Sequence, residues 1–263
     1  MSATISSDPL VHRFDALARA GRRALVTYMT AGHPDPERSL ALLRALEQGG
    51  ADVIEVGVAF SDPMADGPVI QRSSQIALGY GIGLTEVLAM VQEAAVSVPV
   101  VLFSYLNPIM AAGADVLVRA AQAGVHGLLL TDLPVGADPV REAWVGEGPL
   151  AFVRLAAPTT PLDRMREIAR HGRGFVYLIS RLGVTGMQQD VALDLPETIA
   201  RLRSATDLPI CVGFGVSNGE QAKAIGRLAD GIVVGSALVN AAEVSVDAAY
   251  ALTVQLRQAL DAI

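Results

Sequence analysis

The sequence predicts a (β/α)8 fold, the TIM barrel, in which eight parallel strands close into a ring surrounded by helices. The first observation is that short apolar runs alternate with longer amphipathic runs along the whole chain. Strands that are apolar on both faces are typical of a parallel sheet covered by helices. The second is the length of 263 residues, which suits one closed barrel. An open, doubly wound sheet is the alternative that the same alternation allows.

Eight short runs, nearly all apolar at their centres, are the predicted strands. They span 24–32, 51–60, 98–108, 126–134, 149–158, 174–181, 208–216 and 231–239. Amphipathic runs predict helices at 35–50, 84–98, 114–124, 138–148, 161–172, 195–206, 218–231 and 246–263. The first of these begins with Asp-Pro and ends at Gly-Gly, the usual start and stop signals of a helix. An extra N-terminal helix is predicted at 8–21.

Two long loops interrupt the regular repeat. They lie at 61–81, after the second strand, and at 182–194, after the sixth strand. Loops that follow barrel strands meet at the C-terminal face, where barrel enzymes have their active sites. Long loops in a compact domain are usually functional. We therefore expect the site on this face of a single domain that spans residues 1–263, since no linker or low-complexity stretch divides the chain.

Composition excludes several classes of function. The net charge is −7 and there is no run of basic residues, so nucleic acid and anionic membranes are poor partners. No stretch approaches the roughly 18 apolar residues of a membrane span. The first residues, MSATISSDPLVHRF, lack the pattern of a secretory signal, and the single cysteine excludes an internal disulfide. We expect a soluble cytoplasmic protein.

Glu55 is the most unusual strand residue, because it interrupts the apolar run VIEVGV. A buried carboxylate is costly unless it is paired, hydrogen-bonded or neutralised. Alternation along the strand would place Glu55 in the barrel lumen together with Val53 and Gly57. Burial would then raise its pKa and let it exchange protons near neutral pH. The alternative is an interior ion pair, for which Arg154 and Arg181 are the candidates.

Other candidate residues lie at the same end of the predicted strands. Asp62 and Asp66 belong to the first long loop, where either could simply cap a turn. Turn capping alone accounts for each of them, but the position of Asp66 in a long loop above Glu55 makes it the candidate for a second functional carboxylate. Two carboxylates in different environments can divide proton transfer between them. Tyr105 and Tyr177 lie near the ends of strands three and six, and each could contact substrate or only fill the core.

Glycine-bearing turns follow strands seven and eight, where barrels often bind phosphate through backbone amides and a helix N-terminus. Gly213, Gly215, Gly235 and Ser236 allow close approach of the backbone to an anion, although turns alone also use such residues. The segment SRLGVTGMQQ at 180–189 could form a lid that excludes water.

Two scarcities narrow the chemistry further. The only lysine, Lys223, lies in a predicted surface helix, so an aldolase that forms a Schiff base would lack its nucleophile. The four histidines form no ligand-spaced pair, so we expect no metal site. Cys211 is expected to be a buried strand residue. The chemistry that remains after these exclusions is acid–base catalysis by carboxylates on a phosphorylated substrate, without a cofactor.

At this point the chain closely resembles the tryptophan synthase α subunit family. The motif IEVGVAFSDPMADGPVIQ at 54–71 carries the most specific part of the resemblance. Further segments match in order, at 104–109, 128–134, 177–186, 212–217 and 231–239. The resemblance implies a barrel lyase that cleaves indole-3-glycerol phosphate to indole and glyceraldehyde 3-phosphate in tryptophan biosynthesis.

The resemblance also implies roles for individual residues. Glu55 would be the general acid–base, Asp66 would hold the indole N–H, and Tyr177 would stand beside the catalytic carboxylate. The residues that it implies for substrate binding are Tyr28, Tyr105, Leu129, Thr185, Gly186, Phe214, Gly215, Gly235 and Ser236. The chain departs from the family at Ala59, where proline is usual, and at Leu182, where a small or polar residue is commoner.

A partner is implied as well. The family works as an α2β2 heterotetramer with a β subunit that carries pyridoxal phosphate, so no cofactor is expected in this chain. The loop after the second strand and the lid would contact that subunit. Two alternatives remain: an isomerase acting on a phosphoribosyl aromatic amine, and a barrel retained only to bind and activate a partner.

Overall fold

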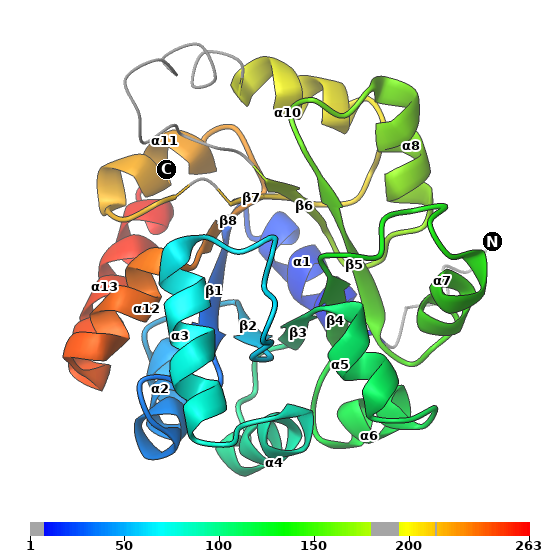
Figure 1. Ribbon diagram of the computed structural model, residues 1–263. Helices are drawn as coiled ribbons and strands as arrows, with labels where there is room; N and C mark the ends of the chain where they lie inside the picture. Colours follow the sequence, from blue (N-terminus) through cyan, green and yellow to red (C-terminus); the bar gives the residue numbers. More distant parts are fainter. Residues whose placement is uncertain (1–7, 180–194, 214) are drawn as a thin grey trace.

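The protein forms a closed eight-stranded parallel barrel, seen in a computed structural model that describes residues 8–179, 195–213 and 215–263 (Figure 1). The strands are β1 (Ala24–Thr30), β2 (Val53–Gly57), β3 (Val100–Ser104), β4 (Gly127–Leu130), β5 (Ala151–Ala156), β6 (Val176–Ile179), β7 (Ile210–Gly213) and β8 (Gly231–Val234). Each strand pairs with the next, and β8 pairs with β1. The predicted barrel is confirmed, and the open sheet is wrong.

Helices surround the ring of strands. They are α1 (Pro9–Arg19), α2 (Pro36–Gln48), α3 (Pro68–Gly79), α4 (Leu84–Ala94), α5 (Leu106–Ala111), α6 (Val116–Gln122), α7 (Pro139–Gly146), α8 (Leu162–Arg170), α10 (Leu195–Arg203), α11 (Gly219–Gly226), α12 (Ser236–Val244) and α13 (Val246–Asp261). Every predicted helix is observed, including the extra N-terminal helix α1.

Three helices lie where the sequence pattern predicted none. The long stretch after β2 is present, but α3 occupies its second half, and Pro68 stands in the first turn of that helix. Helices α5 and α12 begin inside runs that were predicted as strand ends. A short apolar run looks the same in a buried strand and in the first turn of a buried helix, which explains these differences.

The register of β2 turns Glu55 into the barrel. Its neighbours across the sheet are Tyr28 on β1 and Val101 on β3. Val53 belongs to the inner hydrophobic cluster, whereas Ile54 packs in the outer cluster between strands and helices. The predicted alternation along β2 is therefore confirmed.

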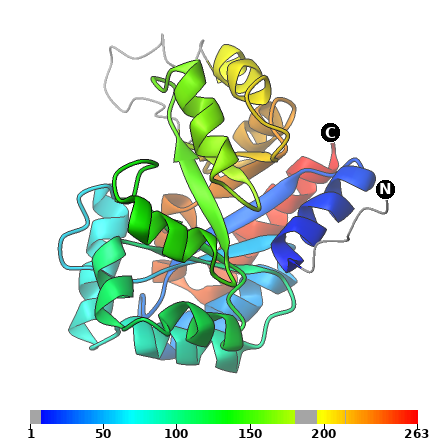
Figure 2. The ribbon, with the colours of Figure 1, turned by 90° about the vertical axis from the view of Figure 1, so that its right-hand side faces the viewer.

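Helix α1 closes the end of the barrel opposite the C-terminal ends of the strands. Leu10, Phe14 and Leu17 of this helix pack with the inner strand residues, and the Phe14 ring lies 5.3 Å from the ring of Phe175. Figure 1 looks into the barrel with α1 behind the strands, and Figure 2 shows α1 on the side away from α3. This plug lets the inner cluster exclude water beneath the site.

Asp52, just before β2, holds this closed end together. Its carboxylate accepts hydrogen bonds from Arg13 on α1 at 2.6 Å, from Arg257 on α13 at 2.8 Å and from the Leu25 backbone N–H at 2.8 Å. The Asp52 side chain is 1% exposed and that of Arg257 is 7% exposed. One buried carboxylate thus joins the first helix, two strands and the last helix.

The described helices include none that is by itself long and apolar enough to cross a membrane. Helices α3 and α4 taken together have the length and apolar composition of a membrane span, but the chain bends by 95° between them.

We expect Asp52→Ala to lower the free energy of unfolding by about 3–5 kcal/mol, because it removes the only buried carboxylate among the described partners of Arg257 and leaves it with the half-exposed Asp261. Urea unfolding measures this loss. The control is Asp115→Ala, which removes an exposed pair with Arg119 and should cost less than about 1 kcal/mol. Equal small losses in both variants would contradict a stabilising role for the network.

Candidate active site

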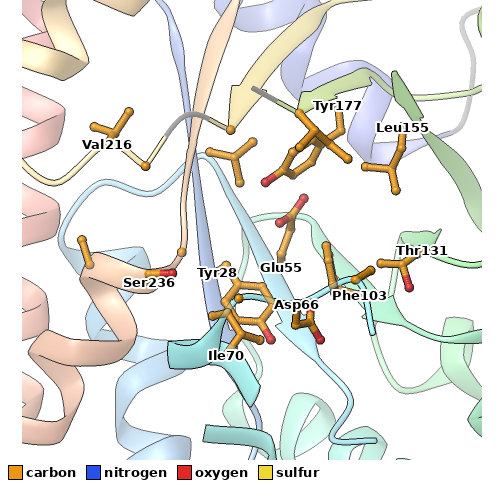
Figure 3. A pocket seen from close by; sticks show the side chains of 18 of the residues that line it. Tyr28, Glu55, Asp66, Ile70, Phe103, Thr131, Leu155, Tyr177, Val216 and Ser236 are labelled. Atoms are coloured by element: carbon orange, nitrogen blue, oxygen red, sulfur yellow. The ribbon is translucent and has the colours of Figure 1, made fainter. Parts of the chain in front are cut away.

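A cavity of about 450 Å3 opens at the C-terminal ends of the strands (Figure 3). Its floor and walls come from strand ends, and its rim comes from the turns after β2, β7 and β8. The lining residues are Tyr28, Glu55, Ala65, Asp66, Gly67, Ile70, Phe103, Thr131, Leu155, Tyr177, Ile179, Gly213, Gly215, Val216, Ser217, Val233, Gly235, Ser236, Ala237 and Asn240. Segments that are distant in the sequence therefore converge on one chamber.

Glu55 lies in this cavity and is 1% exposed. Burial raises the pKa of its carboxyl group to about 8. Among the described residues, its Oε1 atom is buried and has no hydrogen-bond partner. In Figure 3 the carboxyl group points toward Tyr177. A carboxyl group in this setting is protonated at neutral pH and can donate a proton.

The predicted alternative, an ion pair with Arg154, is wrong. Arg154 points out of the barrel and lies 3.2 Å from Glu142, with its guanidinium 3.6 Å from the centre of the Phe152 ring. Arg181 lies outside the described residues.

Asp66 reaches the same cavity from the stretch after β2. The Tyr105 hydroxyl donates to Asp66 Oδ2 at 3.1 Å and accepts from the Ala65 backbone N–H at 2.9 Å. Gln71 on α3 donates to the Asp66 carbonyl oxygen at 2.9 Å. Burial raises the pKa of Asp66 to about 6, and the Tyr105 hydrogen bond opposes this rise. Asp66 therefore remains largely ionised at pH 7, whereas Glu55 is largely protonated.

Two tyrosines and two glycines shape the walls of the chamber. Tyr28 is buried and Tyr177 is partly buried, and burial raises the pKa of each hydroxyl far above its ordinary value, so both stay neutral. A Cβ atom at Gly57 would collide with the Tyr28 hydroxyl, and one at Gly213 would collide with the Tyr177 hydroxyl. These glycines make room for the rings. Phe103 completes this wall with its ring 5.3 Å from that of Tyr28.

The turns after β7 and β8 form one rim of the cavity. Gly215 has a φ of +66°, a conformation that favours glycine. Gly235 precedes α12, whose first turn has no side-chain cap among the described contacts. The first amide groups of a helix have no partners within the helix, so here they can bind an anion together with the Ser236 hydroxyl. The structure thus brings the two predicted glycine turns together.

Several predicted residues lie elsewhere. Tyr105 is behind Asp66 and does not line the cavity, and Leu129 is fully buried in the inner cluster. Substrate contact by these two residues stays a prediction. Asp62 is exposed, does not line the cavity and accepts a hydrogen bond from the Ser61 hydroxyl at 2.5 Å. The predicted residues outside the described part of the chain are Thr185, Gly186 and Phe214, together with Leu182 and the whole lid segment 180–189.

Some lining residues escaped the sequence analysis. Phe103 and Leu155 point inward because of strand register, and Asn240 faces the cavity one helical turn after Ser236. Counting by two along a strand and by four along α12 could have found all three.

No group of three or more His, Cys, Asp or Glu side chains within residues 8–179, 195–213 and 215–263 is arranged to hold a metal ion.

Comparison with known proteins decides the family. A sequence profile described as "Tryptophan synthase alpha chain" matches residues 14–261. The chain belongs to the tryptophan synthase alpha chain family. The alpha chain of Laribacter hongkongensis is 46% identical over 259 residues, covering 95% of this chain and 98% of the relative. That of Gluconacetobacter diazotrophicus is 46% identical over 243 residues, covering 91% of this chain and 89% of the relative.

Solved structures agree with this family. The crystal structure of tryptophan synthase subunit alpha from Legionella pneumophila has a TM-score of 0.88 at 36% identity, covering 98% of this chain and 100% of that one. A tryptophan synthase structure from Mycobacterium tuberculosis also has a TM-score of 0.88 at 36% identity, covering 97% and 99%. As a tryptophan synthase alpha chain, the protein is a carbon–carbon lyase that cleaves indole-3-glycerol phosphate in tryptophan biosynthesis.

We expect Glu55→Gln to remove a pH dependence of stability. Between pH 4.5 and about 8 the unfolded chain ionises Glu55 while the folded chain keeps it protonated. The folded state then binds more protons, so its stability relative to the variant should fall as pH rises, by up to about 1.4 kcal/mol per pH unit.

Urea unfolding of both proteins at several pH values between 5 and 9 measures this difference, which should level off above pH 8. Glu93→Gln, on the exposed surface of α4, is the control and should track the native protein. Parallel curves for the native protein and Glu55→Gln would show that burial does not perturb Glu55.

Proposed function

We propose that Glu55 is the general acid–base and Asp66 the charge-stabilising carboxylate in the cleavage of indole-3-glycerol phosphate. The observation that carries this assignment is the buried carboxyl group of Glu55, whose Oε1 atom has no hydrogen-bond partner among the described residues, in a chamber whose rim suits a phosphate. Burial keeps this group protonated at neutral pH, where an ordinary glutamate would be ionised.

The chamber suggests how the substrate lies. Its phosphate binds the amides at Gly215 and Gly235 and the Ser236 hydroxyl, which form the rim. The indole ring occupies the apolar part of the chamber, against the wall that Tyr28 and Phe103 form, where an aromatic ligand displaces water. The side chain of the substrate then spans from the rim to the floor, where Glu55 lies.

The reaction begins when protonated Glu55 gives its proton to carbon 3 of the indole ring. The positive charge that results spreads to the ring nitrogen, and the Asp66 carboxylate accepts a hydrogen bond from that N–H and stabilises the charge. The hydroxyl group on the adjacent side-chain carbon then loses its proton to the Glu55 carboxylate. The carbon–carbon bond breaks, its electron pair returns to the ring, and indole and glyceraldehyde 3-phosphate form.

Two tyrosines support these carboxyl groups. Tyr177 stays neutral beside Glu55 and excludes water from it. Tyr105 fixes Asp66 through its hydrogen bond, so it acts from behind the cavity wall. Thr185, Gly186 and Phe214 complete the substrate contacts in this proposal.

The partner in this proposal is a tryptophan synthase β subunit, in an α2β2 assembly located in the cytoplasm. The relatives of known structure include tryptophan synthase in an aminoacrylate-bound form. Pyridoxal phosphate would belong to the β subunit, because Lys223, the only lysine here, lies on α11 outside the cavity. Met64, which is 89% exposed in the stretch after β2, is an apolar side chain that such a partner would cover.

Indole release from indole-3-glycerol phosphate, with and without a β subunit, tests the assignment. We expect Glu55→Gln to lower kcat by about 10²–10⁴-fold, the usual contribution of a general acid. The variant should still bind the β subunit. Asp62→Asn is the matched control in the same loop and should keep nearly full activity. Unchanged turnover in Glu55→Gln would refute the assignment. If the native protein releases no indole even with a β subunit, the non-catalytic alternative is supported.

The pH profile of kcat/KM provides a second test. Asp66 must be ionised and Glu55 protonated, so activity should fall below about pH 6 and above about pH 8. The two values describe the site as a whole, because the two carboxyl groups share one cavity. Asp66→Asn should lose the acid limb and retain the alkaline limb. A profile that rises steadily above pH 8 would contradict the role of Glu55 as an acid.

A further inference from the structure

Helix α3 begins two residues after Asp66, and an ion pair ties it to α12, the helix whose N-terminus forms the anion rim. Arg72 on α3 donates to both carboxylate oxygens of Glu243 on α12, with Nη2 2.7 Å from Oε1 and 2.8 Å from Oε2. Its Nε atom lies 3.2 Å from Oε1. The two helices contact one another and lie side by side in Figure 1.

Two further residues hold this ion pair in place. His33, in the turn after β1, is 1% exposed, and its Nε2 atom lies 3.2 Å from Glu243 Oε1. Arg72 Nη2 also reaches Asn240 Oδ1 at 3.5 Å, and Asn240 lines the cavity. We call Arg72, Glu243, His33 and Asn240 the Arg72 clamp. It joins α3, α12 and the end of β1.

A single exposed ion pair contributes little to stability, and the side chains of Arg72 and Glu243 are 53% and 33% exposed. A guanidinium that binds both oxygens of a carboxylate does, however, fix the relative orientation of the two side chains as well as their distance. The clamp therefore matters for where α3 lies relative to α12 more than for how stable the barrel is.

Helix α3 also contacts the loop that contains Asp66, so the position of the helix affects the position of Asp66. Gln71, next to Arg72, donates to the Asp66 carbonyl oxygen at 2.9 Å and to the Pro63 carbonyl oxygen at 3.3 Å. Ser73 lies 2.6 Å from the Thr30 hydroxyl, so the same turn of α3 is also docked on β1. The turn that contains Arg72 thus connects the anion rim on one side with the Asp66 loop on the other.

We propose that Arg72 is a positioning residue, which sets the place of Asp66 relative to the phosphate-binding rim by clamping α3 to α12. The proposal rests on the assigned role of Asp66 in the cleavage. The described groups that face Asp66 and interact with it electrostatically are Tyr28, Tyr105 and Tyr177, and Glu55 shares its cavity. These groups include no cation, so the titration of Asp66 reports how deeply the loop buries it.

The test compares Arg72→Ala with Arg203→Ala. Arg203 forms a similarly exposed ion pair between elements, 2.5 Å from Asp230, at the opposite end of the barrel. In Arg72→Ala, hydrogen–deuterium exchange across 61–71 should become at least about threefold faster. The acid limb of kcat/KM should move down by about 0.5–1 pH unit, because a looser loop hydrates Asp66. Arg203→Ala should change neither quantity.

Two more variants separate position from folding. Arg72→Lys keeps the positive charge but lacks the planar guanidinium that binds both carboxylate oxygens. The pH of its acid limb should therefore lie between those of the native protein and Arg72→Ala. In Glu243→Gln the exchange rate and the limb should shift in the same direction as in Arg72→Ala. If either quantity in Arg72→Ala matches Arg203→Ala, the proposal is overturned. The exchange comparison needs no catalysis, so failure of the clamp and failure of the Asp66 assignment remain distinguishable.

Discussion

The structure depends on one constraint: a carboxylic acid must stay buried in the barrel lumen, where none of the residues that the structure describes gives it a cationic partner. Glu55 is nearly inaccessible, and burial alone accounts for its raised pKa. Such a group is tolerated only where water cannot reach it from below and where the surrounding packing cannot move aside. The plug formed by α1, with Phe14 against Phe175, supplies the first condition. The glycines that admit the Tyr28 and Tyr177 rings supply the second.

The two carboxyl groups of the site differ because their supports differ. Glu55 belongs to a strand hydrogen-bonded on both sides, whereas Asp66 belongs to a loop held by Tyr105 and Gln71. The strand gives complete burial, and the loop gives partial burial with one hydroxyl donor. The pKa of one group is therefore about 8 and that of the other about 6, so an acid and a carboxylate coexist at neutral pH.

The barrel and its main acid could be predicted from sequence because both depend on local patterns. Apolar runs mark the strands, and alternation within VIEVGV decides that Glu55 faces inward. The partner of Asp66 could not be predicted in this way, because Tyr105 lies 39 residues away and meets it only where the ends of the paired strands β2 and β3 come together. Asp62 and Asp66 both lie in turn-like sequence, and the structure distinguishes them by the Tyr105 contact and by the place of Asp66 in the cavity wall. Helix α3 was missed because polar turn residues precede it, although Pro68 signals its start.

Asp52 and Glu55, three residues apart, show how one strand serves stability and chemistry at its two ends. Asp52 lies at the closed end, where Arg13 and Arg257 bind its carboxylate and α1 and α13 are thereby fixed. Glu55 lies toward the open end, where no described cation approaches it. A buried carboxylate with arginine partners remains charged and holds elements together, whereas one without them keeps its proton. The placement of arginines around β2 therefore decides which of these two acids joins the elements of the barrel and which one stays protonated in the cavity.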